Sequence, residues 1–504
     1  MKKSRMIKST AVIGMAAVLM TACSEAEGSE TVPGGNDTEN TENNENEEDE
    51  ENEENNSEET VKGGSEVPDS DAPKNVIMMI GDGMGVGQIE IARLLEHGKE
   101  GILNMEELEH TALMRTYSAN NWVTDSGAAG TGIATSTKTD NGMISVTPDG
   151  EELDSILELF QAHDKKVGVV SNNTVTDATP AAFVASVENR SDSEEIARQM
   201  YEAEYDVMLG GGEDDFLPEA QDGDNLMEMF EEKGYPVVTD RDELLDAGTP
   251  DKLLGLFHPS FMNYKVDYDL YDSNEPSLNE MSEAALEVLS QDDDGFFLMV
   301  EGARIDHVSH AADFTGIWQE TIEFDNTVSD VMEWADDRDD TLVVVLADHE
   351  TMGVAASEVM DKEGLRNVTA SPEYMVTQFE FDEEEGIYTT ESVQSVFEEH
   401  TGVELTEEEV DMFNEYIYDE EGELLATHRI GWEVGSLIAS HFGAGIMDRE
   451  IRAEGETGGH TGNMVPVFAE GVGAERFNGT LDNTDITKII AELAEMDYEP
   501  GEIQ

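Results

Sequence analysis

Basic residues are scarce in this chain of 504 residues. It carries 27 Lys and Arg against 116 Asp and Glu, which gives a formal net charge of −89. A nucleic acid is therefore not expected as a partner, because binding to its phosphate backbone depends on Lys and Arg. The hydrophobic fraction of 38% is large enough for a real core, and the length allows one large α/β domain or two to three smaller ones.

Cysteine is almost absent as well. Cys23 is the only one in the chain, which excludes an intramolecular disulfide. Residues 1–23 start with a basic segment and continue with an apolar segment that is too short to span a bilayer. They end in Met20-Thr21-Ala22-Cys23, which resembles a bacterial lipoprotein cleavage box. We expect a signal peptide and a lipid anchor on Cys23 that holds the exported protein at the cell envelope, on its periplasmic or outer surface. The alternative is ordinary signal-peptide cleavage nearby.

Residues 24–73 contain few apolar side chains and are rich in Glu, Asn, Ser and Gly. Such a segment cannot bury enough apolar surface to fold, so we expect a disordered acidic tether whose charges extend it. Without the first 73 residues the chain still has 97 acidic and 22 basic side chains, a net charge of −75 for residues 74–504. A folded domain this acidic repels itself unless salt screens the charges, which suggests adaptation to high salt.

Continuous apolar runs recur along residues 74–504. Runs of this kind are typical of strands that are buried in a parallel sheet. They cover residues 74–80, 166–170, 206–209, 295–300, 341–346 and 465–468. Helical patterns lie between and after them, at residues 154–160, 279–290, 317–337 and 485–496. The alternation predicts an α/β fold with a mostly parallel sheet.

Residues 355–455 contain no residues with the spacing of metal ligands. Residues 407–418 and 431–442 have helical patterns. We interpret residues 355–455 as an insertion on the α/β core that covers the site or forms an interface.

Metal-ligand residue types follow the apolar runs at the points where the strands should end. In an open α/β sheet, ligands bind at the carboxyl ends of the strands. Each position alone is explained equally well by a turn or a helix cap, but the set of oxygen and nitrogen donors suits Zn²⁺ and Mg²⁺. The residues are Asp82, Glu301, Asp306, His310, Asp348, His349 and His460. Asp306 and His310 are four residues apart, which places both on one face of a helix.

A possible nucleophile lies in the segment 121–132, where Asp125 and Ser126 precede a run of Gly, Ala and Thr. Small residues of this kind favour a tight turn into a helix, with Ser126 in the first turn near free backbone N–H groups. A turn that uses small residues only for close packing explains the segment equally well. Arg190 is one of few cations and could clamp phosphate oxygens. A serine, an arginine and metal ligands together indicate phosphoryl transfer.

Taken in order along the chain, these motifs resemble those of the bacterial alkaline phosphatases. The resemblance extends from Val76 to Phe468. It rests on Asp82, Thr124-Asp125-Ser126, Asp177-Ala178-Thr179-Pro180, Arg190, Glu301-Gly302-Ala303-Arg304-Ile305-Asp306, His310, Asp348-His349 and His460-Thr461-Gly462. It implies that residues 74–504 form a three-layer sandwich with a large, mostly parallel central sheet flanked by helices. It also implies a crown-like region inserted at about residues 355–455.

The resemblance implies three metal ions, two of zinc and one of magnesium. The first zinc ion would be held by Asp306, His310 and His460 and the second by Asp82, Asp348 and His349, while the magnesium ion would be held by Asp82, Thr179 and Glu301. His307 stands where some members of the family carry Lys and others His. Together with Asp177 it would adjust the magnesium site.

For the reaction, the resemblance implies hydrolysis of small phosphate monoesters with release of inorganic phosphate. Ser126 would be the nucleophile and would become phosphoserine. Arg190 would bind the phosphate, and Asp125 would orient Arg190. Because members of the family form dimers, a homodimer is the partner that the resemblance suggests.

Two other functions compete with this interpretation. One is a different activity within the same superfamily, such as that of a phosphodiesterase, a phosphonate hydrolase or a sulfatase. The other is a non-enzymatic acidic lipoprotein that binds cations at the cell surface. The acidic tether suits the second alternative, but the ordered set of ligands does not.

Overall fold

The structure is a computed structural model that describes residues 72–419 and 422–503. The predicted signal peptide, the lipidation site Cys23 and nearly all of the predicted tether lie outside the described residues. Within the described part of the chain, no helix combines the length and the apolar character needed to cross a membrane.

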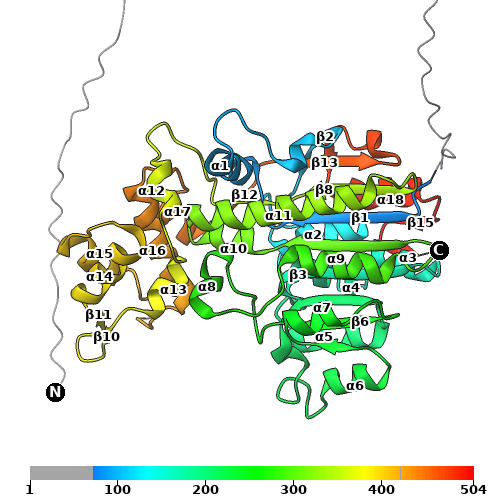
Figure 1. Ribbon diagram of the computed structural model, residues 1–504, viewed down its shortest axis with the longest axis horizontal. Coiled ribbons are helices and arrows are strands. Elements are labelled where there is room, and N and C mark those ends of the chain that lie inside the picture. The colour runs from blue at the N-terminus through cyan, green and yellow to red at the C-terminus, as the bar shows by residue number, and fades with distance from the viewer. Residues whose placement is uncertain (1–71, 420–421, 504) are drawn as a thin grey trace, which may run out of the picture. The chain divides into compact units, whose positions relative to one another are not determined.

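A ten-stranded sheet forms the centre of the described part of the chain (Figure 1). The strand β13 (Val465–Gly471) is antiparallel to both of its neighbours in the sheet, and all other neighbouring pairs of strands are parallel. The order is β14 (Gly479–Asp482), β2 (His110–Arg115), β13 (Val465–Gly471), β8 (Thr341–Leu346), β1 (Asn75–Gly81), β7 (Phe296–Gly302), β3 (Lys166–Thr174), β4 (Val207–Gly211), β6 (Leu253–Leu256) and β5 (Val237–Val238).

The apolar runs of the sequence form the middle of this sheet. Every residue of β1, β7 and β8 is buried, as expected for strands covered on both faces. In the parallel register, Ile80 of β1 lies opposite Glu301 on one side and Leu346 on the other. The carboxyl ends of these three strands therefore meet at one edge of the sheet.

Helices cover both faces of the sheet, which completes the predicted three layers. One face carries α1 (Val86–Glu96), α9 (Leu278–Leu289) and α11 (Phe314–Ala335), with α7 (Arg241–Asp246) beside α9. The other face carries α2 (Ser126–Thr135), α3 (Ile156–Ala162), α4 (Ala178–Val184) and α18 (Asp485–Leu493), with α5 (Ser193–Ala203) and α6 (Leu226–Glu232) toward the β5 edge. The fold class predicted from the sequence is confirmed.

Two features of the sheet differ from what the apolar runs suggest. The run at residues 465–468 forms β13, which is antiparallel to β8. The strands β2, β5, β6 and β14 have no counterpart among the predicted runs. β2 alternates between buried and exposed positions, so its sequence lacks a continuous apolar stretch.

The helices of the region 355–455, called the crown below, lie to one side of the sheet (Figure 1), and this region has a hydrophobic cluster separate from the main core. Its helices are α12 (Lys362–Arg366), α13 (Pro372–Thr377), α14 (Thr390–Thr401), α15 (Glu407–Glu415), α16 (Thr427–His441) and α17 (Arg449–Glu454), and a hairpin joins β10 (Phe381–Asp382) to β11 (Ile387–Tyr388). The cluster also includes Ile91 of α1 and Ile317 of α11. The crown therefore packs on the helices of one face of the core.

Candidate functional site

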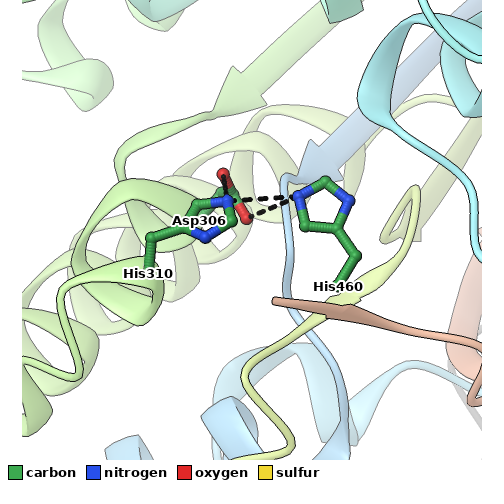
Figure 2. A group of neighbouring side chains, drawn as sticks. All are labelled: Asp306, His310 and His460. Carbon is green, nitrogen blue, oxygen red and sulfur yellow. Dashed lines mark hydrogen bonds and ion pairs between the residues drawn. The ribbon is translucent and has the colours of Figure 1, made fainter. Parts of the chain in front are cut away.

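The first group of potential ligands joins a helix to a distant turn. Asp306 and His310 lie one turn apart on α10 (Arg304–His310), as the spacing predicts, and His460 starts the short strand β12 (His460–Thr461). His310 Nε2 lies 3.1 Å from Asp306 Oδ2 and 3.1 Å from His460 Nε2. Figure 2 shows the three side chains pointing toward a common centre. Three such donors, all buried, can hold one metal ion and leave a coordination position open.

Backbone contacts fix both imidazoles of this group. His310 Nδ1 lies 3.0 Å from the carbonyl oxygen of Gly458, and His460 Nδ1 lies 2.9 Å from that of Thr124. A carbonyl oxygen can only accept, so each Nδ1 carries the proton and each Nε2 keeps its lone pair. Gly458 and Gly459 both have positive φ, of 73° and 127°, and their turn delivers His460 to the site.

The second group comes from the ends of two neighbouring strands. Asp82 follows β1, and Asp348 and His349 follow β8. His349 Nε2 lies 3.2 Å from Asp348 Oδ2 and 3.4 Å from Asp82 Oδ1. These two carboxylate oxygens are buried and have no hydrogen-bond partner among the described residues. A buried acceptor without a partner is costly, and a cation between them would satisfy both.

An oxygen-rich corner adjoins the second group. Thr179 Oγ1 donates to Asp82 Oδ2 at 3.3 Å, and Glu301 Oε2 accepts from Ser171 at 2.5 Å. Glu301 Oε1 is buried without a partner among the described residues. Oxygen donors of this kind suit Mg²⁺. Sequence reasoning missed Ser171, because a serine inside a strand carries no special signal.

The electrostatics of the site suit a bound cation. Burial raises the pKa of Asp348 to about 7, and burial together with the charge of Asp348 raises the pKa of Asp82 well above its usual range. Burial also raises the pKa of Glu301 well above its usual range. In contrast, burial lowers the pKa of His460 to about 4 and that of His349 well below its usual range. Neutral imidazoles beside crowded carboxylates are what a divalent metal ion needs as ligands.

Ser126 is the first residue of α2, as the sequence predicts. Asp125 caps this helix by accepting a hydrogen bond from Ala128 N at 3.0 Å. Ser126 Oγ lies 3.1 Å from His349 Nε2, so the hydroxyl adjoins the second ligand group. The small residues of α2 also serve packing, because a Cβ on Gly130 would lie 3.0 Å from Ala182 of α4. The small residues of the segment 121–132 therefore form the turn into α2 and also permit close packing, and the role of Ser126 as a nucleophile stays a prediction.

Arg190 lies between two carboxylates near Ser126. Its NH1 donates to Asp125 Oδ2 at 3.0 Å, and its NH2 lies 3.7 Å from Asp177 Oδ1. Burial by itself would lower the pKa of Arg190, but Asp177 and Asp125 outweigh it and raise the pKa. The guanidinium is therefore charged and held in one orientation.

The first ligand group opens toward a cavity of about 450 Å³, and Ser126 connects this cavity with the second group, because its Oγ lies 3.1 Å from His349 Nε2. Ser126, Arg190 and the first ligand group line one part of it. His307 also lines it but belongs to neither ligand group, and Arg304 NH1 contacts its Nδ1. Burial and the neighbouring Arg304 hold the pKa of His307 well below its usual range.

The crown forms another part of the cavity wall, which includes Trp432 of α16. The Trp432 ring lies 4.9 Å from the His310 ring and only 9° from parallel to it. Gly435 permits this approach, because a Cβ there would lie 1.8 Å from the carbonyl oxygen of Ala311. Sequence reasoning missed Trp432, since nothing in its spacing relates it to the ligands.

Thr351 was missed as well, although it links the two ligand groups. It lies on β9 (Glu350–Thr351), which pairs with β12 and places Thr351 opposite His460. Its hydroxyl donates to Asp306 Oδ1 at 2.5 Å and lies 3.3 Å from His349 Nδ1. Because the hydroxyl proton goes to Asp306, Nδ1 of His349 must donate to it, which leaves Nε2 of His349 free for a metal ion.

Comparison with known proteins gives consistent results. The model of the alkaline phosphatase family matches residues 73–496. Alkaline phosphatase 4 of Bacillus subtilis (strain 168) is 31% identical over 452 residues, which cover 86% of this chain and 92% of that protein. The crystal structure of the Thermus thermophilus alkaline phosphatase is 28% identical with a TM-score of 0.75, over 86% of this chain and 93% of that one. A cold-active enzyme of the same name from Shewanella sp. is 29% identical with a TM-score of 0.70, over 83% and 99%.

Proposed function

The chain belongs to the alkaline phosphatase family and is an enzyme, and we propose that it hydrolyses phosphate monoesters through a phosphoserine on Ser126. The observation that carries the proposal is the distance of 3.1 Å between Ser126 Oγ and His349 Nε2. Around that contact lie the unpartnered carboxylate oxygens of Asp82 and Asp348. A hydroxyl becomes a nucleophile when a bound metal ion lowers its pKa, and it then needs no separate base.

We assign two zinc ions and one magnesium ion to the site. The supporting observations are two groups of mixed carboxylate and imidazole donors and one corner of oxygen donors. The zinc ligands are Asp306, His310 and His460 for the first ion and Asp82, Asp348 and His349 for the second, and the magnesium ligands are Asp82, Thr179 and Glu301. Variants of the alkaline phosphatase from the Antarctic bacterium TAB5 contain Mg in a site called M3, which supports a magnesium ion here. When bound, the ions would supply the positive charge that lowers the pKa of a hydroxyl and stabilises a leaving oxygen.

The residues of the chain then divide the remaining tasks. Arg190 binds two non-bridging oxygens of the phosphate with its planar guanidinium, and Asp125 keeps that plane in place. Ser126 Oγ attacks phosphorus in line and displaces the alcohol. Water then attacks the phosphoserine and releases inorganic phosphate. Two successive in-line displacements retain the configuration at phosphorus. Asp177 and His307 adjust the magnesium site from outside its ligands.

Replacing Ser126 tests this mechanism. We expect Ser126→Ala to lower kcat/KM for p-nitrophenyl phosphate by about 10³-fold or more, since the covalent step is lost. Wild-type enzyme that is quenched in acid should carry phosphate on Ser126, and the variant should carry none. Ser290→Ala is the matched control, because Ser290 is exposed at the end of α9. Full activity of Ser126→Ala would contradict the mechanism.

A chelator tests the metal assignment. Removal of the metal ions by the chelator should abolish phosphatase activity. Zn²⁺ and Mg²⁺ added together should restore more activity than either ion alone. Metal analysis of the purified protein should find zinc and magnesium near a ratio of two to one. Recovery with Mg²⁺ alone would exclude the zinc sites.

A phosphodiesterase or a sulfatase of the same superfamily is the second candidate function. Arg190 and the proposed magnesium ligands Thr179 and Glu301 favour the monoester, because a phosphate monoester is a dianion and gains more from nearby positive charge than a diester or a sulfate ester with a single negative charge. The ratio of kcat/KM for p-nitrophenyl phosphate to that for bis-p-nitrophenyl phosphate separates the two, and a preference for the diester would overturn the monoester assignment. A purely cation-binding lipoprotein is set aside, because the chain belongs to a family of enzymes.

For its place in the cell we propose export and a lipid anchor on Cys23. The composition of residues 1–23 supports this. Labelled fatty acid should be incorporated by wild-type protein and not by Cys23→Ala. We also propose a homodimer, as the family resemblance suggests, and sedimentation of the soluble domain tests it.

A further inference from the structure

A second cavity adjoins the one that contains Ser126. Its volume is about 500 Å³, and none of the proposed metal ligands or catalytic residues lines it. The two cavities share four lining residues, which are Phe261, Tyr264, Arg304 and Glu373. Because these residues line the same cavity as Ser126, the shared wall borders the space that is open to the alcohol of a bound monoester. Together the cavities are large enough for an alcohol of the size of a nucleoside.

Phe261 is the exposed part of this wall. Its neighbour Met262 is fully buried and Phe257 is 6% exposed, yet Phe261 itself is 45% exposed. The segment is held in place, because Gly212 N donates to the carbonyl oxygens of His258 at 2.9 Å and Ser260 at 3.0 Å. Its exposure is therefore a property of a fixed loop, and a rigid aromatic ring that faces a cavity is a ready surface for another ring.

Arg304 makes the same wall rigid. It is 5% exposed, and its guanidinium lies 3.7 Å from the centre of the Tyr264 ring and 5.6 Å from that of Phe261. Phe261 in turn meets the His307 ring edge-on at 5.0 Å. The Nε–H of Arg304 has no hydrogen-bond partner among the described residues. The wall thus offers the exposed ring of Phe261, and the buried Arg304 and the His307 ring hold this ring in place.

The charges around the wall indicate what it would reject. Glu373 lines both cavities, Asp267 lines the second, and Asp313 and Glu456 line the first. Arg304 also lines both cavities, but it is one positive charge against these four carboxylates, so a second phosphate or a carboxylate on the alcohol would be repelled on balance. A neutral planar ring meets no such repulsion.

We infer that Phe261, Tyr264 and Arg304 form a leaving-group site that selects monoesters whose alcohol carries a neutral aromatic ring, as aryl phosphates and nucleoside 5′-monophosphates do. This inference rests on the proposed monoesterase function. The ring stacks against Phe261, and Phe261 determines specificity without touching the phosphorus. The site acts on binding of the alcohol, so its effect appears in KM and in inhibitor affinity.

Two phosphonates test the site without any bond cleavage. Phenylphosphonate and methylphosphonate carry the same anionic group and differ in the ring. In Phe261→Ala the ratio of their inhibition constants should shift by about tenfold toward methylphosphonate, because ring stacking is lost. Phe261→Tyr should keep the wild-type ratio, and Phe261→Leu should behave like Phe261→Ala. An unchanged ratio in Phe261→Ala, or an equal weakening of both inhibitors, would overturn the inference.

Hydrolysis gives the second arm, with adenosine 5′-monophosphate, phenyl phosphate and glycerol 2-phosphate as substrates. The wild-type-to-variant ratio of kcat/KM cancels the intrinsic reactivity of each ester. We expect Phe261→Ala to lower kcat/KM about tenfold for both aromatic esters and less than about threefold for glycerol 2-phosphate. Phe381→Ala is the matched control, because Phe381 is 36% exposed on β10 and lines neither cavity. Equal losses for all three esters would overturn the inference, whereas a wild-type enzyme that cleaves none of them would instead overturn the proposed function.

Discussion

The α/β core and the crown contribute to one cavity in different ways. The core supplies the second ligand group from adjacent strand ends, where backbone register alone brings Asp82 and Asp348 together. The crown supplies no ligand to either group and adds the side chain of Trp432 against His310. In the proposed function the core therefore supplies the reacting groups, whereas the crown holds the His310 ring and lines part of the cavity. Substitutions in the two regions should separate these effects.

The largest effect should come from Thr351 in the core. Its hydroxyl contacts Asp306 of the first group and His349 of the second. We expect Thr351→Val, which keeps the shape, to weaken metal binding at both groups and to lower activity by about 10–100-fold. Titration with a chromogenic zinc chelator measures the metal affinity. Thr351→Ser should recover most of the loss, and a variant that weakens only one group would contradict the link.

Trp432 in the crown should give a smaller effect that is limited to the first group. Without the stacked ring, His310 loses the side chain that packs on the face of its imidazole, although its Nδ1 keeps the hydrogen bond to the carbonyl oxygen of Gly458. We expect Trp432→Ala to lower the affinity of the first ligand group for zinc by about tenfold and to leave the affinity of the second group unchanged. Trp334→Ala is the control, because Trp334 packs against Phe296 away from both groups. An equal loss of zinc affinity at both groups would show that the crown does not act on the first ligand group alone.

Asp267 of the core is hydrogen-bonded to the crown, and its raised pKa should make the stability of the protein depend on pH. Its carboxylate accepts from Ser371 N at 2.8 Å and from Ser371 Oγ at 2.6 Å. Burial raises the pKa of Asp267 to about 6, although the bonds from Ser371 act in the opposite direction. The folded protein therefore binds more protons than the unfolded chain between the ordinary pKa of 3.8 and about 6. The contribution of Asp267 to stability is full at low pH and is lost as the pH rises through about 6.

Asp267→Asn removes this titration. Relative to wild type, the variant should gain up to about 3 kcal/mol of unfolding free energy as the pH rises from about 4 to about 7. Urea unfolding of both proteins across this range measures the difference. A difference that stays constant with pH would show that Asp267 does not titrate there.

The smallest effect for each side chain should come from screening the acidic surface with salt. Residues 74–504 carry a net charge of −75, and we propose that the protein is adapted to high salt. The melting temperature should rise between about 0.1 M and about 2 M NaCl as the charges are screened, and KM for a monoester should fall. Equal stability at both concentrations, or a KM that rises steadily, would count against this adaptation.

The sequence predicts the core better than the crown for physical reasons. Buried parallel strands need continuous apolar runs, so residues 341–346 and 295–300 are visible without a structure. The four-residue spacing places Asp306 and His310 on one helical face. His460 depends on the pairing of β12 with β9, and two-residue strands carry no periodic signal. Trp432 depends on how one helix packs on another, which local sequence does not encode.

The contact between His460 Nδ1 and the carbonyl oxygen of Thr124 has a consequence for protein engineering. Thr124 is two residues before Ser126, so the turn that carries His460, a proposed metal ligand, rests on the loop that carries Ser126, the proposed nucleophile. A loop exchanged alone between relatives would move both groups out of alignment. Residues 121–126 and 457–462 therefore form a single unit of exchange, and chimaeras should transfer them together.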